Sequence, residues 1–337
     1  MVRMQPLRRH VLPFACVLLL LAGEVCAQGP EAVCIGLRLG IPGARGIRGY
    51  GMGNTMVAST GEPHNPAMVF AEEMQATARV GLTEYDDAGE TDVISTWLAV
   101  QGPLSQDEAF RVVIVDIESD WDPSGWIAAP GAQMRLTGTH LALDYSRAIS
   151  DRLRVGLAVT PVLDTDISLR MDSVPVVATV SGKVMLRGGR IGVDWQVRDD
   201  LRVAAHYDVC EIDAVAVNVA TDSRTQADLS LRDFIVGAEW AVDDATSVAL
   251  EFDAGSVKGG GYRNTVDAIS GGVEYRLPEG LALRAGMTDG TPTLGAGWES
   301  DEVSVGLAWI RDQYGDEIGA ALSTSDAWYL AVDVPFR

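Results

Sequence analysis

Positive charge, cysteine and long apolar runs are scarce in this chain of 337 residues. Lys and Arg together number 26 against 47 Asp and Glu, which gives a net charge of −21 at pH 7. Nucleic-acid binding depends on cationic neutralisation of phosphates, so we expect no nucleic-acid partner. The same balance disfavours adhesion to anionic lipid through a basic face. We also expect no metal and no cofactor, because the 4 His and 4 Cys show no ligand spacing.

Residues 1–27 have the composition of a secretory signal peptide. A basic start precedes an apolar core over Val11–Ala22, and small residues predict cleavage after Ala27. This cleavage would remove three Arg and one Glu, so the net charge would become −23. It would leave Cys34 and Cys210, for which a disulfide and two unpaired thiols are both open interpretations. Beyond the signal, no uncharged apolar run reaches the roughly 18–20 residues of a membrane-spanning helix.

Alternation of apolar and polar residues runs through most of the chain. The last strand is typical, because every second residue from Trp328 to Phe336 is apolar. In an internal example, Val248, Leu250 and Phe252 alternate with Ala249, Glu251 and Asp253. Such segments are about as long as a tilted membrane strand, and their apolar faces carry almost no charge. The pattern predicts an all-β fold, a single transmembrane antiparallel β-barrel of about fourteen strands. A soluble exported β-sandwich is the alternative, although its strands are usually shorter.

The connections between these segments alternate in length. One set is short and acidic, such as Arg198-Asp199-Asp200 and Asp243-Asp244. The other set is longer, such as Ile117–Arg135 and Thr165–Val184. Short turns on one side and long loops on the other are typical of an outer-membrane barrel. We therefore expect outer-membrane localisation, with both chain termini in the periplasm.

A glycine-rich motif precedes the first strand. It resembles the N-terminus of the FadL-type outer-membrane barrels and of the related type nine secretion barrels, and the matching residues are Gly43, Ala44, Arg45, Gly46, Gly51, Met52, Gly53, Ala58, Asn65, Pro66 and Ala67. The resemblance implies fourteen strands, a plug segment over residues 28–74 and a barrel over residues 75–337. It also implies that hydrophobic molecules pass outward through the wall. Ile47-Arg48 and Met68-Val69 differ from the pattern of that family.

Charged residues are expected on the inner face of the barrel. The predicted lumen charges are Arg152, Arg154, Arg190, Asp194, Arg202, Asp208, Glu239 and Glu251. They could form a paired network that shuts the lumen, or a charged pore or carboxylate-binding site. Trp121 and Trp126, in a predicted outer loop, could capture a hydrophobic ligand or sit at the membrane interface. No nucleophile accompanies the His140–Asp144 pair, so we expect no enzyme.

The function that this sequence favours is passive transport of hydrophobic small molecules across the outer membrane. The alternative is a non-transporting barrel that serves as a structural or secretion platform. The expected partners are outer-membrane lipid, a hydrophobic ligand and the barrel-assembly machinery. An apolar pocket behind the plug would favour transport, whereas a solid network of charges would favour the platform.

Overall fold

A computed structural model describes most of the strands of this chain and two short N-terminal segments. The described residues are 47–52, 55, 65–69, 73–85, 91–121, 132–171, 178–218, 223–259, 262–300, 302–311 and 325–336. The predicted signal peptide, Cys34 and the start of the glycine-rich motif lie outside these ranges. Within them, Cys210 is a free thiol. None of the helices in the described ranges is long and apolar enough to cross a membrane.

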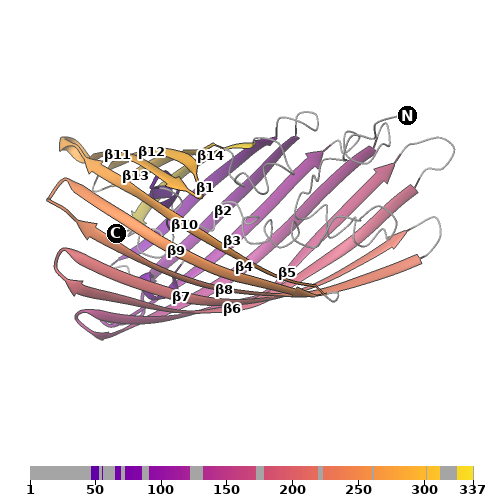
Figure 1. Ribbon diagram of the computed structural model, residues 1–337, viewed down its shortest axis with the longest axis horizontal. Coiled ribbons are helices and arrows are strands. Elements are labelled where there is room, and N and C mark those ends of the chain that lie inside the picture. The colour runs from indigo at the N-terminus through magenta and orange to yellow at the C-terminus, as the bar shows by residue number, and fades with distance from the viewer. Residues whose placement is uncertain are drawn as a thin grey trace, which may run out of the picture.

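Fourteen antiparallel strands close into one barrel (Figure 1). Each strand pairs with its neighbours in sequence, and β1 pairs with β14 from Met74↔Phe336 to Tyr85↔Ser325. This confirms the predicted all-β, fourteen-stranded barrel. The strands are β1 (Met74–Tyr85), β2 (Thr91–Pro103), β3 (Glu108–Trp121), β4 (Ala132–Ser150), β5 (Leu153–Met171), β6 (Ala178–Arg198), β7 (Leu201–Asn218), β8 (Ser223–Ala241), β9 (Thr246–Gly259), β10 (Tyr262–Arg276), β11 (Leu281–Thr288), β12 (Thr291–Glu299), β13 (Ser304–Ile310) and β14 (Ser325–Phe336).

The two faces of the wall differ in chemistry, as the alternation predicts. On β9 the side chain of Leu250 is 61% exposed on the outside, whereas its neighbour Glu251 is 3% exposed on the inside. Leu157, Val193 and Leu307 are likewise exposed. Exposed apolar area on this scale is unfavourable in water, at about 25 cal/mol per Å². A continuous apolar exterior around a closed barrel therefore faces lipid.

Aromatic side chains mark one border of this apolar exterior. They are exposed near the short turns, and they are Tyr145, Trp195, Trp240, Tyr275 and Trp298. Aromatic rings with a polar edge prefer the membrane–water interface. The short-turn end of the barrel thus lies just beyond one membrane surface.

The short turns gather at one end of the barrel, where β1 also begins and β14 ends (Figure 1). At the other end the strands differ greatly in length. Strands β4 to β8 have 18 to 21 residues, whereas β11, β12 and β13 have 7 to 9. The wall is therefore tall on one side and low on the other.

Several connections predicted to be long are shorter than expected. The expected loop Thr165–Val184 is mostly strand, because β5 and β6 stay paired up to Met171↔Ala178. Likewise β7 and β8 stay paired up to Asn218↔Ser223, inside the expected loop Cys210–Thr225. In β5 the alternation continues through this stretch, since Ile167, Leu169 and Met171 alternate with polar neighbours, so the loop prediction was wrong. On the low side, β11 and β12 join through Asp289-Gly290, both with positive φ, as a two-residue hairpin turn requires.

Candidate functional site

The Asn-Pro-Ala motif forms a short 3-10 helix, η1 (Pro66–Met68), against the inner wall. Asn65 caps it, since its Oδ1 accepts a hydrogen bond from the Ala67 amide at 3.0 Å. The Asn65 Nδ2 donates to the carbonyl oxygen of Val193 on β6 at 2.9 Å. One side chain thus orders the turn and ties it to the wall, which is the work expected of an N-cap residue.

Glycines on the wall make room for this helix. A Cβ at Gly156 on β5 would lie 2.5 Å from the Pro66 carbonyl oxygen, and one at Gly192 on β6 would lie 2.9 Å from Asn65 Cγ. These two glycines are direct partners across β5 and β6. Heavy atoms cannot approach so closely, so any larger residue at either position would displace the motif.

Apolar contact and a further hydrogen bond complete the seat of η1. Met68 is buried in a cluster with Ala204 on β7 and Ile235 on β8. The Ser146 hydroxyl on β4 donates to the carbonyl oxygen of Val69. The motif is therefore held across five neighbouring strands, β4 to β8, by both hydrogen bonding and apolar packing.

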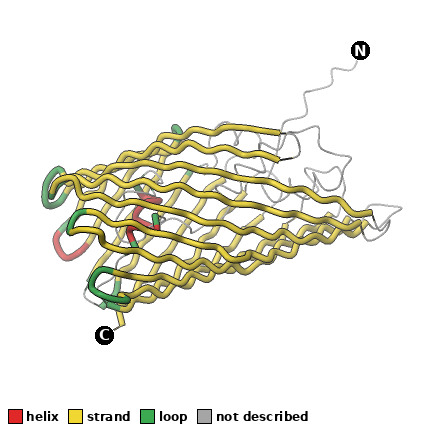
Figure 2. Tube along the Cα trace, turned by 90° about the horizontal axis from the view of Figure 1, so that it is seen from below, coloured by secondary structure: helices red, strands yellow, loops and turns green. Residues whose placement is uncertain are grey.

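The second internal segment is the short helix α3 (Ile47–Gly51), which lies against β11 to β14. Figure 2 shows the two short N-terminal helices near the end that carries the turns. A Cβ added to Gly51 would lie 3.0 Å from Cα of Gly295 on β12, and a Cβ on Gly272 would lie 2.5 Å from the Met52 carbonyl carbon. The Thr293 hydroxyl donates to the Gly51 carbonyl oxygen at 3.2 Å. Glycine on both surfaces lets the two backbones touch.

Arg48 attaches α3 to the neighbouring part of the wall, strands β8 to β10. Its guanidinium forms ion pairs with Glu239 on β8 and with Glu274 on β10, the latter at 2.9 Å, and donates to the Ser247 hydroxyl on β9 at 3.0 Å. The Arg48 side chain is 9% exposed. A buried charge is tolerated only when it is paired and hydrogen-bonded, and Arg48 satisfies this condition.

Glu274 is the centre of this network. Its carboxylate is 1% exposed and accepts from Arg48, from Arg276 Nε at 3.0 Å and from Arg284 Nε at 2.7 Å. Glu239 is the second carboxylate of the group. Among the described residues, these two carboxylates face three guanidinium groups.

Further ion pairs between neighbouring strands lie on the inner face of the barrel, between β3 and β4 and between β6 and β7. Arg202 binds Asp194 through two nitrogens, at 2.6 and 2.7 Å. Arg190 pairs with Asp208, and His206 Nε2 lies 3.6 Å from the same carboxylate. A third pair joins Arg111 on β3 and Asp144 on β4, and the side chain of His140 lies outside the described part. The described lumen near η1 and α3 therefore holds a network of paired charges.

The remaining predicted site residues lie in several places. Arg154 and buried Glu251 belong to the inner face, in the same alternating set as Gly156 and Asp253. Arg152 does not belong to it, which corrects the sequence prediction. It precedes the first residue of β5, its side chain is 56% exposed, and it pairs at 3.0 Å with Asp199 of the next turn.

Part of the predicted motif cannot be placed. Gly43, Ala44, Arg45, Gly46 and Gly53 lie outside the described residues, as does Trp126. Trp121 is the last residue of β3, and its side chain is also outside the described part. The proposed ligand capture by the two tryptophans stays a prediction.

Sequence reasoning missed the importance of Arg48 and of the wall glycines. A charge inside a glycine run was the available signal for Arg48, which was noted only as a departure from the family pattern. Gly156 and Gly192 fall on the inward set of their strands, where most residues fill space. Small residues at facing inward positions are the signal that something else occupies the lumen there.

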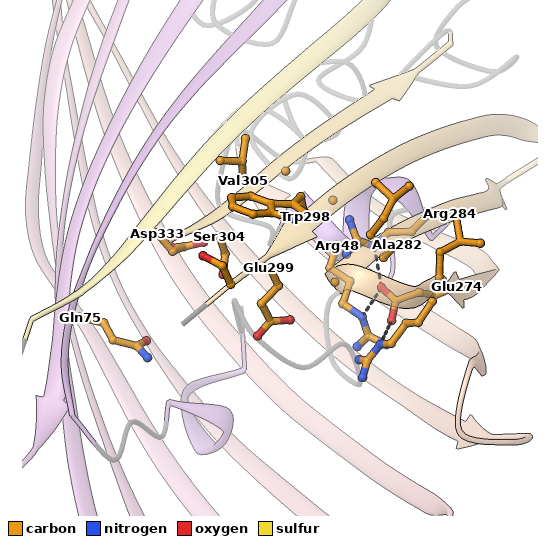
Figure 3. Close-up of a pocket in the computed structure, with 17 residues that line it drawn as sticks. Arg48, Gln75, Glu274, Ala282, Arg284, Trp298, Glu299, Ser304, Val305 and Asp333 are labelled. Carbon is orange, nitrogen blue, oxygen red and sulfur yellow. Dashed lines mark hydrogen bonds and ion pairs between the residues drawn. The ribbon is translucent and has the colours of Figure 1, made fainter. Parts of the chain in front are cut away.

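A polar cavity of about 540 Å³ lies beside α3, near the end with the short turns (Figure 3). Arg48, Glu274 and Arg284 line its inner part. Within the described ranges, no cluster of His, Cys, Asp and Glu is arranged to hold a metal ion.

No protein-family model and no curated protein matches this sequence. Solved structures do match its fold. The toluene transporter TbuX of Ralstonia pickettii has a TM-score of 0.62 at 16% identity, over 87% of this chain and 98% of that chain. The toluene transporter TodX of Pseudomonas putida has a TM-score of 0.60 at 13% identity, over 86% and 96%. A FadL homologue of Pseudomonas aeruginosa has a TM-score of 0.59 at 15% identity, over 87% and 98%. The chain therefore has the fold of the FadL-type outer-membrane barrels, as its glycine-rich motif predicted.

Proposed function

We propose that this protein is an outer-membrane barrel that lets hydrophobic small molecules cross the membrane passively. The proposal includes export by a signal peptide cleaved after Ala27 and a plug formed by the N-terminal segment. It is supported by the lipid-facing exterior and by the two internal helices docked on the wall. It is also supported by the fold shared with toluene transporters. No cofactor or catalytic group takes part.

The fold shared with toluene transporters carries the proposal, and the contacts of α3 restrict the route. Arg48 joins α3 to Glu239 and Glu274, so the axial path beside them is charged. Moving an apolar solute along this path would separate buried ion pairs, at about 3–5 kcal/mol for each broken pair. Hydrophobic molecules must therefore leave through the wall, or pass only when α3 moves.

The low side of the wall is the proposed exit. Strand β10 pairs with β11 only from Ser270 to Arg276, although β10 continues to Tyr262. Over this stretch the β11–β12 hairpin has already turned back at Asp289-Gly290. Its outer face carries exposed Met287 and Leu294, so a solute that crosses its rim reaches an apolar surface. No matching low rim occurs among strands β4 to β8, which are at least twice as long as β11, β12 and β13.

The charge network also supports the alternative, a barrel that does not transport. Paired charges such as Arg202–Asp194 and Arg190–Asp208 rigidify the lumen and leave it hydrated. A platform for a partner protein would need such a closed barrel and no apolar route. The two functions differ in whether removal of the plug contacts changes solute flux.

Uptake of labelled toluene and of a labelled fatty acid by cells lacking their own transporter tests the proposal. The parent protein should raise uptake, and deletion of residues 42–58 should lower it. Arg48→Gln should have an intermediate effect, whereas Arg198→Gln, in an exposed turn pair with Asp200, should match the parent. Equal uptake with and without the protein would remove transport and leave the platform.

A further inference from the structure

The cavity beside α3 exists because three facing residues of its inner wall are small. Ala282, Gly297 and Gly306 are direct neighbours across β11, β12 and β13. None of them can fill the lumen at this level, and a cavity of about 540 Å³ remains. Such a volume suits a small ligand. It lies among the ends of the strands that carry the short turns, on the periplasmic side in the proposed orientation.

One end of the cavity is cationic and incompletely paired. Arg284 donates from Nε to Glu274, but its buried Nη1 has no hydrogen-bond partner. The Arg284 side chain is 10% exposed. Arg276 also uses Nε for Glu274, while its side chain is 57% exposed toward the mouth. The exposed Arg276 guanidinium is placed to receive one more carboxylate, with the buried Arg284 guanidinium behind it.

The other end of the cavity is anionic. Glu299 on β12 and Asp333 on β14 flank Ser304, which is paired with both residues across the strands. Figure 3 shows these three side chains apart from the Arg48–Glu274–Arg284 group. Asp333 accepts a hydrogen bond from Thr77, and Glu299 forms no ion pair with any described residue. A positive group would therefore be stabilised at this end.

The spacing of the two ends defines the ligand. The Arg284 guanidinium lies over Gly297, since a Cβ on that glycine would be 2.7 Å from Nη1. Glu299 is two residues farther along β12, which corresponds to about 6.6 Å. A dipeptide separates its ammonium and carboxylate by about the same distance, at roughly 3.3–3.6 Å per residue. A simple anion would bind only the cationic end of the cavity, and the second negative charge of a dianion would be repelled by Glu299.

We propose that this cavity binds a small zwitterionic solute of the amino-acid or short-peptide class from the periplasmic side. Its carboxylate lies against Arg276 and Arg284, and its ammonium group points to Glu299. Apolar residues such as Leu277 and Val305 also line the cavity, but its two charged ends distinguish it from a route for hydrophobic molecules. It therefore does not depend on the transport function proposed above.

Calorimetric titration of the full chain in detergent micelles tests the site. Glycylglycine is the probe, and acetate and methylammonium are the half-ligands. We expect saturable binding of glycylglycine, and at least tenfold weaker binding of each half-ligand. Arg276→Gln should weaken both glycylglycine and acetate at least tenfold. Glu299→Gln should weaken glycylglycine at least tenfold and leave acetate unchanged.

Both substitutions replace side chains at the exposed mouth, so the variants should keep the heat-modifiable gel mobility of a folded barrel. Arg198→Gln is the matched control, because it removes an exposed guanidinium from a turn outside the cavity. Its affinity for glycylglycine should equal that of the parent. Absence of saturable glycylglycine binding would overturn the proposal. So would folded Glu299→Gln protein with unchanged affinity, because the ligand would then be recognised only as an anion.

Discussion

Substitution of Gly192 by Ala should release the Asn-Pro-Ala motif from the wall while leaving the barrel closed. The new Cβ would lie 2.9 Å from Asn65 Cγ and 3.0 Å from Pro66 Cδ. Asn65 must therefore move away from β6. This movement breaks its bond to the Val193 carbonyl and its cap on the Ala67 amide.

The magnitude follows from these two hydrogen bonds. Each contributes about 1 kcal/mol net, so the docked state loses about 2 kcal/mol before any steric strain is added. A change of about 1.4 kcal/mol is tenfold in an equilibrium constant, so the undocked population should rise about 30-fold. The barrel strands keep all of their ladder bonds, because Gly192 has no side chain that contributes to them.

Hydrogen exchange at the Ala67 amide measures this population in micelles. We expect exchange about 30-fold faster in Gly192→Ala than in the parent, with unchanged protection in β6. Gly189→Ala is the matched control on the same strand, because its new Cβ would meet its nearest atom at an ordinary 3.6 Å. Parental protection of Ala67 in Gly192→Ala would refute the seating of η1 on β6.

Three further changes test other parts of the structure. Because Leu157 faces lipid, Leu157→Arg should destabilise the folded barrel in lipid vesicles by about 2–4 kcal/mol and so lower the folded fraction measured by heat-modifiability. Leu157→Ser should do less harm. Equal assembly of both variants would contradict the assignment of Leu157 to the lipid face. Glu274→Gln should lower the free energy of unfolding in urea by about 3–5 kcal/mol, since three guanidinium groups would lose their shared carboxylate, whereas exposed Glu302→Gln should have little effect. The amide groups of Ala245 and Thr246 donate hydrogen bonds to Asp243 in the β8–β9 turn and hold the pKa of its carboxyl below the usual range. The contribution of Asp243 to the stability of the fold should therefore be present above the ordinary Asp pKa and be lost as the pH falls through the lowered value. NMR titration of this carboxyl measures the pKa, and an ordinary pKa would argue against the turn geometry.

The sequence predicted the wall faces well because lipid imposes a strict rule on one side of each strand. Val248, Leu250 and Phe252 were assigned to the apolar face, and all three are exposed on the outside. The prediction failed at strand ends. Residues 165–184 were interpreted as a loop although they are mostly paired strand, and the alternation of Ile167, Leu169 and Met171 with polar neighbours was overlooked.

Arg152 shows a second limit of alternation. Counting back from Leu153 places Arg152 on the inner face, but this parity holds only inside a strand. The strand begins at Leu153, and beyond it the Arg152 side chain turns out to meet Asp199. Sequence patterns give element boundaries less reliably than element type, because turn geometry depends on neighbouring strands.

The interior could be predicted in kind but not in its pairs. Inward charges follow from alternation, yet the partners of Arg48 lie 191 and 226 residues later in the chain. Only the register of fourteen strands decides that Glu239 and Glu274 meet this guanidinium. The role of the wall glycines was equally hard to predict. A glycine on the inner face leaves space, and only the structure shows which segment occupies that space.

The two internal helices are held by different forces, and this difference decides which one can move. η1 is packed through Met68 on Ala204 and Ile235, in addition to the Asn65 bonds. Apolar contact of this kind is insensitive to salt. α3 has five residues and depends on the ion pairs of Arg48, together with one hydroxyl bond to its last carbonyl. These ion pairs are buried, so salt screens them little, and opening α3 would take one of the three guanidinium groups from Glu274. Removal of the Arg48 charge should therefore release α3 alone, while η1 keeps the N-terminal chain attached to the tall side of the wall.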